Sequence, residues 1–190
     1  MTDVADALGA LARVLGALEL RWYVFGAQAA IVYGASRVTK DVDVTVALGE
    51  LPVATLLASL ADAGFVSRAR DAAELAALAR VVPVTHAASG VPFDLVLAGP
   101  GIEEMFLDNA RERKVADVSV PVAAAEDIVT MKLLAGRPHD REDVVAILRA
   151  QRGAFDEQRV RTSLEMLDEA LDQSDLAASF DDARRRAHGR

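Results

Sequence analysis

The sequence contains no cysteine, and only 5% of its residues are aromatic. Without cysteine the chain has neither a disulfide framework nor a zinc site built on cysteine ligands. Its three histidines, His86, His139 and His188, are scattered and give no zinc-binding spacing. The small number of aromatic side chains also argues against a surface on which single-stranded bases stack.

Long apolar runs and phosphate-loop motifs are missing as well. No hydrophobic stretch approaches the roughly 20 residues needed to span a bilayer. The N-terminal segment carries Asp3 and Asp6 before its first arginine, unlike a secretory signal, and its apolar spacing predicts an amphipathic helix. The chain has no GxxxxGK[ST] motif, which excludes a P-loop protein. We therefore expect a soluble, cytoplasmic protein that makes no membrane contact.

An excess of positive charge is also absent, because the formal net charge is −8. This value excludes a generally basic nucleic-acid-binding protein. The C-terminal arginines Arg184, Arg185 and Arg186 could form a local RNA contact. Basic residues at the end of a helix also stabilise it through the macrodipole, and this second interpretation fits the sequence better.

The chain has 190 residues, of which 52% are hydrophobic, so it can bury a substantial core in one domain or in one domain with an appendage. Alternating and β-branched patterns predict strands or extended segments at 22–25, 42–48, 64–69, 81–87, 91–98 and 114–122. Apolar periodicity predicts helices at 4–20, 27–34, 52–63, 72–79, 102–113, 124–136, 140–150, 156–171 and 175–186. The predicted fold class is α+β: a small mixed-sheet domain at residues 1–122, followed by a helical domain at residues 123–190.

Two carboxylates stand two residues apart at the start of a predicted strand. Asp41 and Asp43 share one face of it, whereas Val42 and Val44 point to the other face, into the core. Two adjacent carboxylates repel each other unless a positive charge lies between them, and Mg²⁺ or Mn²⁺ suits such oxygen ligands. An Asp-x-Asp pair alone is common, however, and often marks a solvated strand edge.

A third acid, Asp94, interrupts the apolar strand predicted at 91–98. A single carboxylate in such a strand is costly unless it is paired or bound to a metal. If this strand lies beside that of Asp41 and Asp43, the three acids converge. Such a cluster suits metal-assisted phosphoryl or nucleotidyl transfer, in which Asp94 either helps to hold a metal or accepts the proton of the attacking hydroxyl.

A family resemblance joins these features. The segment GAQAAIVYGASRVTKDVDVTV places a glycine turn, a short helix and a basic-hydroxyl cluster before the acids. It resembles the signature of the nucleotidyltransferase superfamily with the DNA polymerase β-like fold, and more closely the AbiEii-type nucleotidyltransferases, known mainly as toxins of bacterial toxin–antitoxin pairs. A second block, AAEDIVTMKLLAGRPHDREDVVAIL, resembles their C-terminal pattern, so the likeness extends from about residue 22 to residue 148.

The resemblance implies a role for each matching residue. It makes Asp41, Asp43 and Asp94 the catalytic acids and metal ligands. It also implies a nucleotide-binding role for six residues: Gly26, Ala27, Arg37, Thr39, Lys132 and Asp140. Within this set, Gly26 lets the backbone approach the triphosphate, Lys132 reaches a phosphate and Asp140 supports the site. The sequence departs from the family at Gly26-Ala27, where Gly-Gly or Gly-Ser is usual, so a hydroxyl that could hold a phosphate is missing.

Some of these residues have structural interpretations as well. Lys132 follows Ile128 and Val129 on the apolar side of its helix, so it either extends to solvent or faces a polar pocket. Asp140 and Asp143 lie in the first turn of a predicted helix, where acids are favourable without any further role. Arg37 could be an ordinary loop residue.

The expected function is metal-dependent transfer of a nucleoside monophosphate from an NTP to an acceptor hydroxyl, with Mg²⁺ or Mn²⁺ as cofactor. The helical domain is expected to close over the nucleotide. The acceptor is expected to be RNA, such as a tRNA end, or a partner protein of a toxin–antitoxin system. Two alternatives remain: transfer to a small molecule such as an antibiotic, and a non-catalytic, antitoxin-like protein that keeps the fold and binds a partner.

Overall fold

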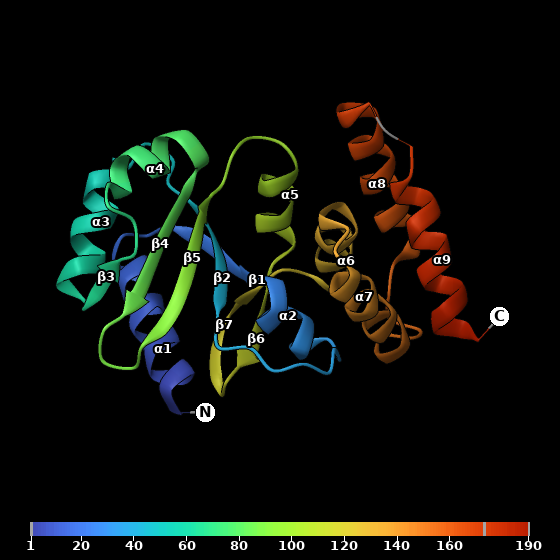
Figure 1. The fold of residues 1–190 in the computed structure, drawn as a ribbon, viewed down its shortest axis with the longest axis horizontal. Helices are drawn as coiled ribbons and strands as arrows, with labels where there is room; N and C mark the ends of the chain where they lie inside the picture. The colour runs from blue at the N-terminus through green and yellow to red at the C-terminus, as the bar shows by residue number, and fades with distance from the viewer. Residues whose placement is uncertain (1, 173, 190) are drawn as a thin grey trace. The chain divides into compact units, whose positions relative to one another are not determined.

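The computed structural model describes residues 2–172 and 174–189, which divide into two compact units. The first unit comprises the described residues up to Gln28 together with Val38–Ala123. The second comprises Ala29–Arg37 and the described residues from Ala124 onward. Figure 1 labels the helices and strands of both units.

The first unit is built on one mixed sheet that contains seven strands within the described residues, in the order β3-β4-β5-β2-β1-β7-β6. The strands are β1 (Arg21–Phe25), β2 (Val42–Ala47), β3 (Phe65–Ser67), β4 (Val81–His86), β5 (Val91–Leu97), β6 (Arg111–Val115) and β7 (Val118–Val122). At its centre β2 is antiparallel to β1 and parallel to β5. The strands predicted at 81–87 and 91–98 form the antiparallel hairpin β4–β5.

Helices of the first unit cover this sheet: α1 (Thr2–Ala17), α3 (Val53–Asp62), α4 (Ala72–Ala79) and α5 (Ile102–Asn109). The leucines of the predicted N-terminal stripe, Leu8, Leu11 and Leu15, are fully buried. Their helix, α1, contacts both β5 and β7, and so lies across the centre of the sheet (Figure 1). The apolar stripe of α1 therefore supplies part of the core beneath the central strands.

One predicted element is wrong at its end. The sequence predicts a helix over residues 102–113, but α5 ends at Asn109, and Ala110 is already extended, with φ −58° and ψ 141°. The residues after it form β6, whose main chain pairs with β7 from Arg111 to Val115. Strand pairing within the sheet thus overrides the helical preference of this charged segment, because sheet hydrogen bonds depend on tertiary context.

The second unit is helical beyond Ala124: α6 (Ala125–Ala135), α7 (Pro138–Ala150), α8 (Glu157–Leu171) and α9 (Leu176–His188). Gly136, with φ +64°, ends α6, and Asp156 begins α8 by accepting a hydrogen bond from the backbone N–H of Arg159 at 3.0 Å. The core between these helices includes Ile147 and Phe180, both fully buried. The predicted fold class, a mixed sheet followed by a helical C-terminal part, is confirmed.

A short segment before β2 also lies in the second unit. The helix α2 (Gly26–Val32) begins in the first unit and ends in the second, where residues 29–37 pack with α7. Gly34 lies so close to α7 that an added Cβ would come within 2.4 Å of the Ala150 Cβ. The Gln151 side chain donates a hydrogen bond to the Tyr33 carbonyl at 3.3 Å. Residues 29–37 are therefore held by the helices that follow residue 124.

None of the helices in residues 2–172 and 174–189 is both long and apolar enough to cross a membrane.

Candidate functional site

The central strands of the first unit bring two predicted acids side by side. In the parallel pairing of β2 with β5, Asp43 is aligned with Asp94. Residues aligned on neighbouring strands point to the same face of a sheet. Val42 and Val44 point to the opposite face and are fully buried, as predicted. The two half-buried carboxylates thus stand on the sheet face opposite to these valines.

Gly26 lies directly against one of these acids. A Cβ added at residue 26 would lie 1.9 Å from Oδ2 of Asp43 and 2.7 Å from its Cγ. The backbone at Gly26 also has φ +64°, which disfavours any residue with a Cβ. The carboxylate of Asp43 therefore occupies the space that a side chain at residue 26 would need.

We expect Gly26→Ala to have two effects: backbone strain at residue 26 and displacement of the Asp43 carboxylate. Gly49 has a similar φ of +56°, but an added Cβ there meets nothing within 4 Å, so Gly49→Ala is the matched control. Each variant should lose about 1–2 kcal/mol of unfolding free energy from the left-handed backbone. Only Gly26→Ala should also displace Asp43, and if the two acids bind a metal ion, calorimetry should show that binding lost in this variant alone. Equal metal affinity in the two variants would show that Gly26 does not fix the position of the carboxylate.

The loop that leads into β2 contains the other predicted residues of the first unit. Asp41 is exposed and precedes the strand; its backbone N–H donates to Oγ1 of Thr39 at 3.2 Å. The Gln28 side chain donates to the Thr39 carbonyl at 3.3 Å. Ala27 is the second residue of α2. Thr39 therefore shapes the main chain just before the acids, a contact that the sequence did not indicate.

The acids fit a metal ion that takes the rest of its ligands from a substrate. Within the part of the chain that the structure describes, no group of three or more His, Cys, Asp or Glu side chains is placed to hold a metal ion. Asp43 and Asp94 nevertheless supply two neighbouring carboxylates. Mg²⁺ is commonly bound by one or two carboxylates together with substrate phosphates, rather than by a cage of protein ligands alone.

A basic residue next to these acids was not predicted from the sequence. Arg68, which directly follows β3, forms an ion pair with Asp94. The available signal was a basic residue in the segment predicted as a strand at 64–69. Nothing in the local pattern, however, indicates that this segment lies near residue 94.

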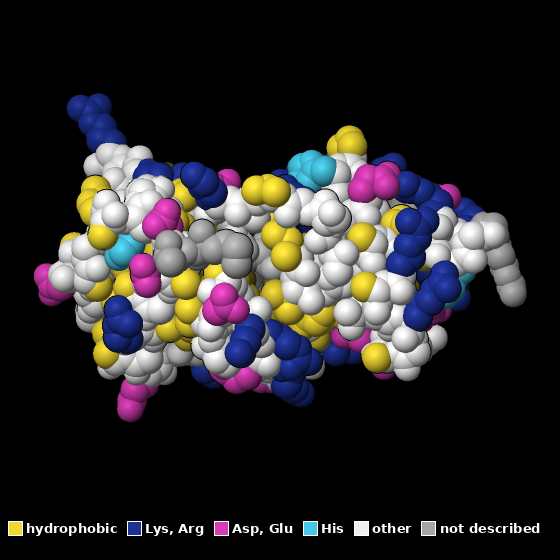
Figure 2. Space-filling model, turned by 90° about the horizontal axis from the view of Figure 1, so that it is seen from below, with side chains coloured by type: hydrophobic (Ala, Val, Ile, Leu, Met, Phe, Trp, Pro, Cys, Tyr) yellow, Lys and Arg dark blue, Asp and Glu magenta, His cyan; other side chains and the backbone are white. Residues whose placement is uncertain are grey.

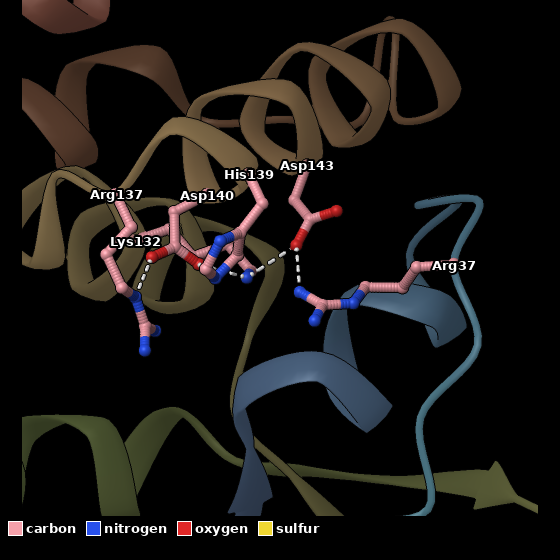
Figure 3. Close-up of polar contacts among 6 residues, drawn as sticks. All are labelled: Arg37, Lys132, Arg137, His139, Asp140 and Asp143. Carbon is pink, nitrogen blue, oxygen red and sulfur yellow. Dashed lines mark hydrogen bonds and ion pairs between the residues drawn. The ribbon is translucent and has the colours of Figure 1, made fainter.

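The second unit contains a buried cluster of charges (Figure 3). Lys132 on α6 donates to Oδ1 of Asp140 at 2.9 Å and to Oδ2 of Asp143 at 2.7 Å. The exposed fractions of these three side chains are only 6%, 0% and 9%. Arg137 reaches Asp140 at 2.5 Å, and Arg37 reaches Asp143 at 2.9 Å. Lys132 therefore faces a polar environment formed by α7, and each acid has a second cationic partner.

These contacts set the ionisation of Asp140. Burial by itself raises the pKa of this carboxyl, but hydrogen bonds from Arg137 and Lys132, together with their positive charges, hold the pKa below its ordinary value. His139 lies 3.6 Å from the same carboxylate and adds positive charge when it is protonated. Asp140 is therefore ionised in the folded protein at neutral pH.

The lowered pKa of Asp140 predicts a dependence of stability on pH. Because the folded-state pKa lies below the unfolded value of about 3.9, the ionised carboxylate stabilises the native state above that pH. This stabilisation is lost as the pH falls through the folded pKa. Urea unfolding of wild type and Asp140→Asn is measured from about pH 6 downward. The difference between their free energies of unfolding should become smaller below about pH 4. A difference that stays constant would contradict the effect. Contributions from acids far from this cluster cancel in the comparison, whereas that of Asp143 does not, because it shares Lys132 with Asp140.

The C-terminal arginines are paired with acids of their own unit. Arg184 lies 2.6 Å from Glu157, and Arg186 lies 2.5 Å from Glu142. Arg185 lies 3.2 Å from Asp182, one turn earlier on α9. Basic and acidic side chains are also interspersed over the face of the molecule that Figure 2 shows. These pairs partly neutralise the arginines and weaken the case for a local RNA contact.

Comparison with solved structures identifies the fold. An antigenic nucleotidyltransferase-like protein from Paracoccidioides brasiliensis matches with a TM-score of 0.57 and 15% identity, over 95% of this chain and 93% of that chain. The antibiotic-resistance factor ANT(2'')-Ia matches with a TM-score of 0.53 and 13% identity, over 97% and 91% of the two chains. The lincosamide antibiotic adenylyltransferase LnuA matches with a TM-score of 0.51 and 14% identity, over 75% and 94%.

The chain therefore has the fold of nucleotidyltransferase-like proteins, as the sequence predicted. At these identities the likeness establishes the fold and not the activity. No protein-family model matches the sequence, and no curated protein matches it either. The closer resemblance to AbiEii-type proteins remains a prediction from the motifs.

Proposed function

We propose that this protein is a metal-dependent nucleotidyltransferase that moves a nucleoside monophosphate from an NTP to an acceptor hydroxyl. The observation that carries the proposal is the alignment of Asp43 with Asp94 on neighbouring strands, with Gly26 leaving room for the carboxylate of Asp43. Two such carboxylates on a nucleotidyltransferase-like fold suit chemistry on the phosphates of a nucleotide.

In this proposal Asp43 and Asp94 would hold Mg²⁺ or Mn²⁺, and the bound ion would supply positive charge against the charge that develops on the phosphates. The acceptor oxygen forms a bond to the α-phosphorus, the bond from that phosphorus to the bridging oxygen breaks, and pyrophosphate leaves with the bonding electrons. A carboxylate of the site takes the hydroxyl proton, and Asp94 is our candidate. The predicted roles of Asp41, Ala27 and Thr39 in the first unit and of Arg37, Lys132 and Asp140 in the second also belong to this proposal.

The acceptor is proposed from the motif resemblance and from charge. The likeness to AbiEii-type proteins favours RNA, such as a tRNA end, or a partner protein in a bacterial toxin–antitoxin system. A second candidate is a small molecule, favoured by the fold shared with an antibiotic-resistance factor and a lincosamide adenylyltransferase. The net charge of −8 also supports this candidate, because it opposes a large RNA footprint and suits a cationic acceptor.

A labelling experiment tests the function and separates the acceptors. Purified protein is incubated with Mg²⁺ or Mn²⁺ and each NTP labelled at its α-phosphate. Total RNA, lysate protein and an aminoglycoside are offered in separate reactions. We expect label in one acceptor pool only, and none after EDTA treatment or with Asp43→Asn. No transfer to any pool, together with no NTP binding by calorimetry, would overturn the enzymatic function in favour of a non-catalytic partner-binding protein.

A further inference from the structure

A basic residue stands at the end of the row of side chains that contains the acids. The backbone N–H of Arg68 donates to the Pro83 carbonyl at 2.9 Å, which extends the β3–β4 pairing by one residue. Pro83 is aligned with Asp94 in the β4–β5 hairpin, and Asp94 is aligned with Asp43. The four residues thus form one row across four neighbouring strand positions, in the order Arg68, Pro83, Asp94, Asp43.

The side chain of Arg68 reaches across the intervening proline to the nearer acid. Its Nη2 donates to Oδ1 of Asp94 and also to the Phe93 carbonyl, the latter at 3.1 Å. Pro83 has a short ring and no backbone N–H, so it neither blocks this path nor competes for the carboxylate. The Arg68 and Asp94 side chains are 41% and 46% exposed. The pair is therefore accessible to a ligand that approaches from solvent.

The charges in the row give this contact a consequence. Arg68 places one positive charge beside the carboxylate pair of Asp43 and Asp94. A divalent cation on these carboxylates would repel the guanidinium, because Arg remains protonated in proteins. Arg68 would then be a cation without its acid partner, next to a site into which a nucleotide brings a triphosphate. Guanidinium groups bind phosphate well, since their N–H groups match two phosphate oxygens.

We propose that Arg68 is the counter-ion of Asp94 in the metal-free site and the triphosphate-binding residue of the metal-loaded site. This inference rests on the proposed function, because it uses the same pair of acids. It assigns to Arg68 two effects of opposite sign: Arg68 weakens the binding of a metal ion alone and strengthens the binding of a metal–triphosphate complex.

The matched control is Arg80, which lies in the same unit and makes the same kinds of contact. Its guanidinium donates to the Leu97 carbonyl at 2.9 Å and pairs with Glu103 at 2.7 Å, with side chains 47% and 30% exposed. Arg68→Met and Arg80→Met therefore remove the same charge and the same type of ion pair. Of these two arginines, Arg68 pairs with Asp94 and Arg80 pairs with Glu103.

The test measures the binding of Mn²⁺ alone, by electron paramagnetic resonance, and of Mn²⁺ with inorganic triphosphate, by calorimetry. We expect Arg68→Met to bind Mn²⁺ about three- to tenfold more tightly than wild type, since it removes an exposed ion pair and a nearby positive charge. The same variant should bind the Mn²⁺–triphosphate complex about tenfold more weakly, because it loses charged hydrogen bonds to phosphate. Arg80→Met should match wild type in both measurements.

The outcomes separate this inference from the proposed function. If all proteins except Asp43→Asn bind Mn²⁺ but Arg68→Met behaves like Arg80→Met, the metal site stands and the role of Arg68 is wrong. A parallel change in both affinities would also overturn the inference, since it predicts opposite signs. If no protein binds Mn²⁺, the proposed function fails and the inference fails with it.

Discussion

We expect Asp43→Asn to lower the rate of the proposed nucleotidyl transfer by roughly 10²- to 10³-fold, by analogy with the loss of one group that stabilises a developing charge. Asparagine has nearly the same shape, so it fits the space against Gly26 and should leave the fold intact. It carries no negative charge, however, and so removes half of the carboxylate pair that Asp43 forms with Asp94. The measurement is single-turnover transfer of label from the NTP that the labelling experiment selects.

The control for this variant is Asp62→Asn, which makes the same change of charge at an exposed residue at the end of α3. We expect it to keep the wild-type rate. Circular dichroism should be unchanged for Asp43→Asn, and the unfolding midpoint should not fall, because a neutral amide relieves repulsion between adjacent carboxylates. Wild-type activity in Asp43→Asn would exclude a metal site at this acid pair.

The second large effect concerns stability and the buried charges of the second unit. We expect Lys132→Met to lower the free energy of unfolding by about 3 kcal/mol, since breaking a buried ion pair leaves uncompensated charge. Two carboxylates, those of Asp140 and Asp143, lose a hydrogen bond from the ammonium group. The value lies at the low end of the usual range because Arg137 and Arg37 each still pair with one acid. Urea unfolding of the purified variant measures the loss.

Two further variants distinguish this mechanism from a general loss of packing. Arg185→Met breaks an exposed pair with Asp182 and should cost less than about 1 kcal/mol. Adding Asp140→Asn and Asp143→Asn to Lys132→Met removes the uncompensated acids and should restore most of the lost stability. If Lys132→Met is as stable as wild type, the cluster does not stabilise the unit.

The predicted contact of Lys132 with a nucleotide phosphate is tested separately, by measuring NTP affinity on those variants that remain folded.

Local sequence patterns predict the strands that carry the two acids, but not their pairing. The alternation of VDVTV and the apolar run around Asp94 each indicate a strand by themselves. The alignment of Asp43 with Asp94 joins segments that are far apart in the chain. From the sequence alone, the convergence of the acids could be stated only on the condition that the two strands are neighbours. The family resemblance supplied the expectation that these strands are neighbours.

The same limit explains what the sequence analysis missed. Arg68 reaches Asp94 only because β3 pairs with β4 and β4 with β5, which depends on tertiary structure. Lys132 was predicted on the apolar side of its helix, and the choice between solvent and a polar pocket depended on α7. The end of α5 was misplaced because strand pairing outweighs local helix preference at residues 110–113. Local patterns therefore determine the type of most elements, and long-range contacts determine their partners.

The assignment of residues 29–37 to the second unit has a consequence for synthesis on the ribosome. This segment emerges before β2, yet the groups that hold it, Asp143, Ala150 and Gln151, are made only after the whole sheet. The first unit can therefore begin to fold before α7, against which residues 29–37 pack, has been synthesised. The contact of residues 29–37 with α7 can form only after the chain has been synthesised as far as Gln151. Completion of the helical unit thus depends on a segment that left the ribosome long before the helices.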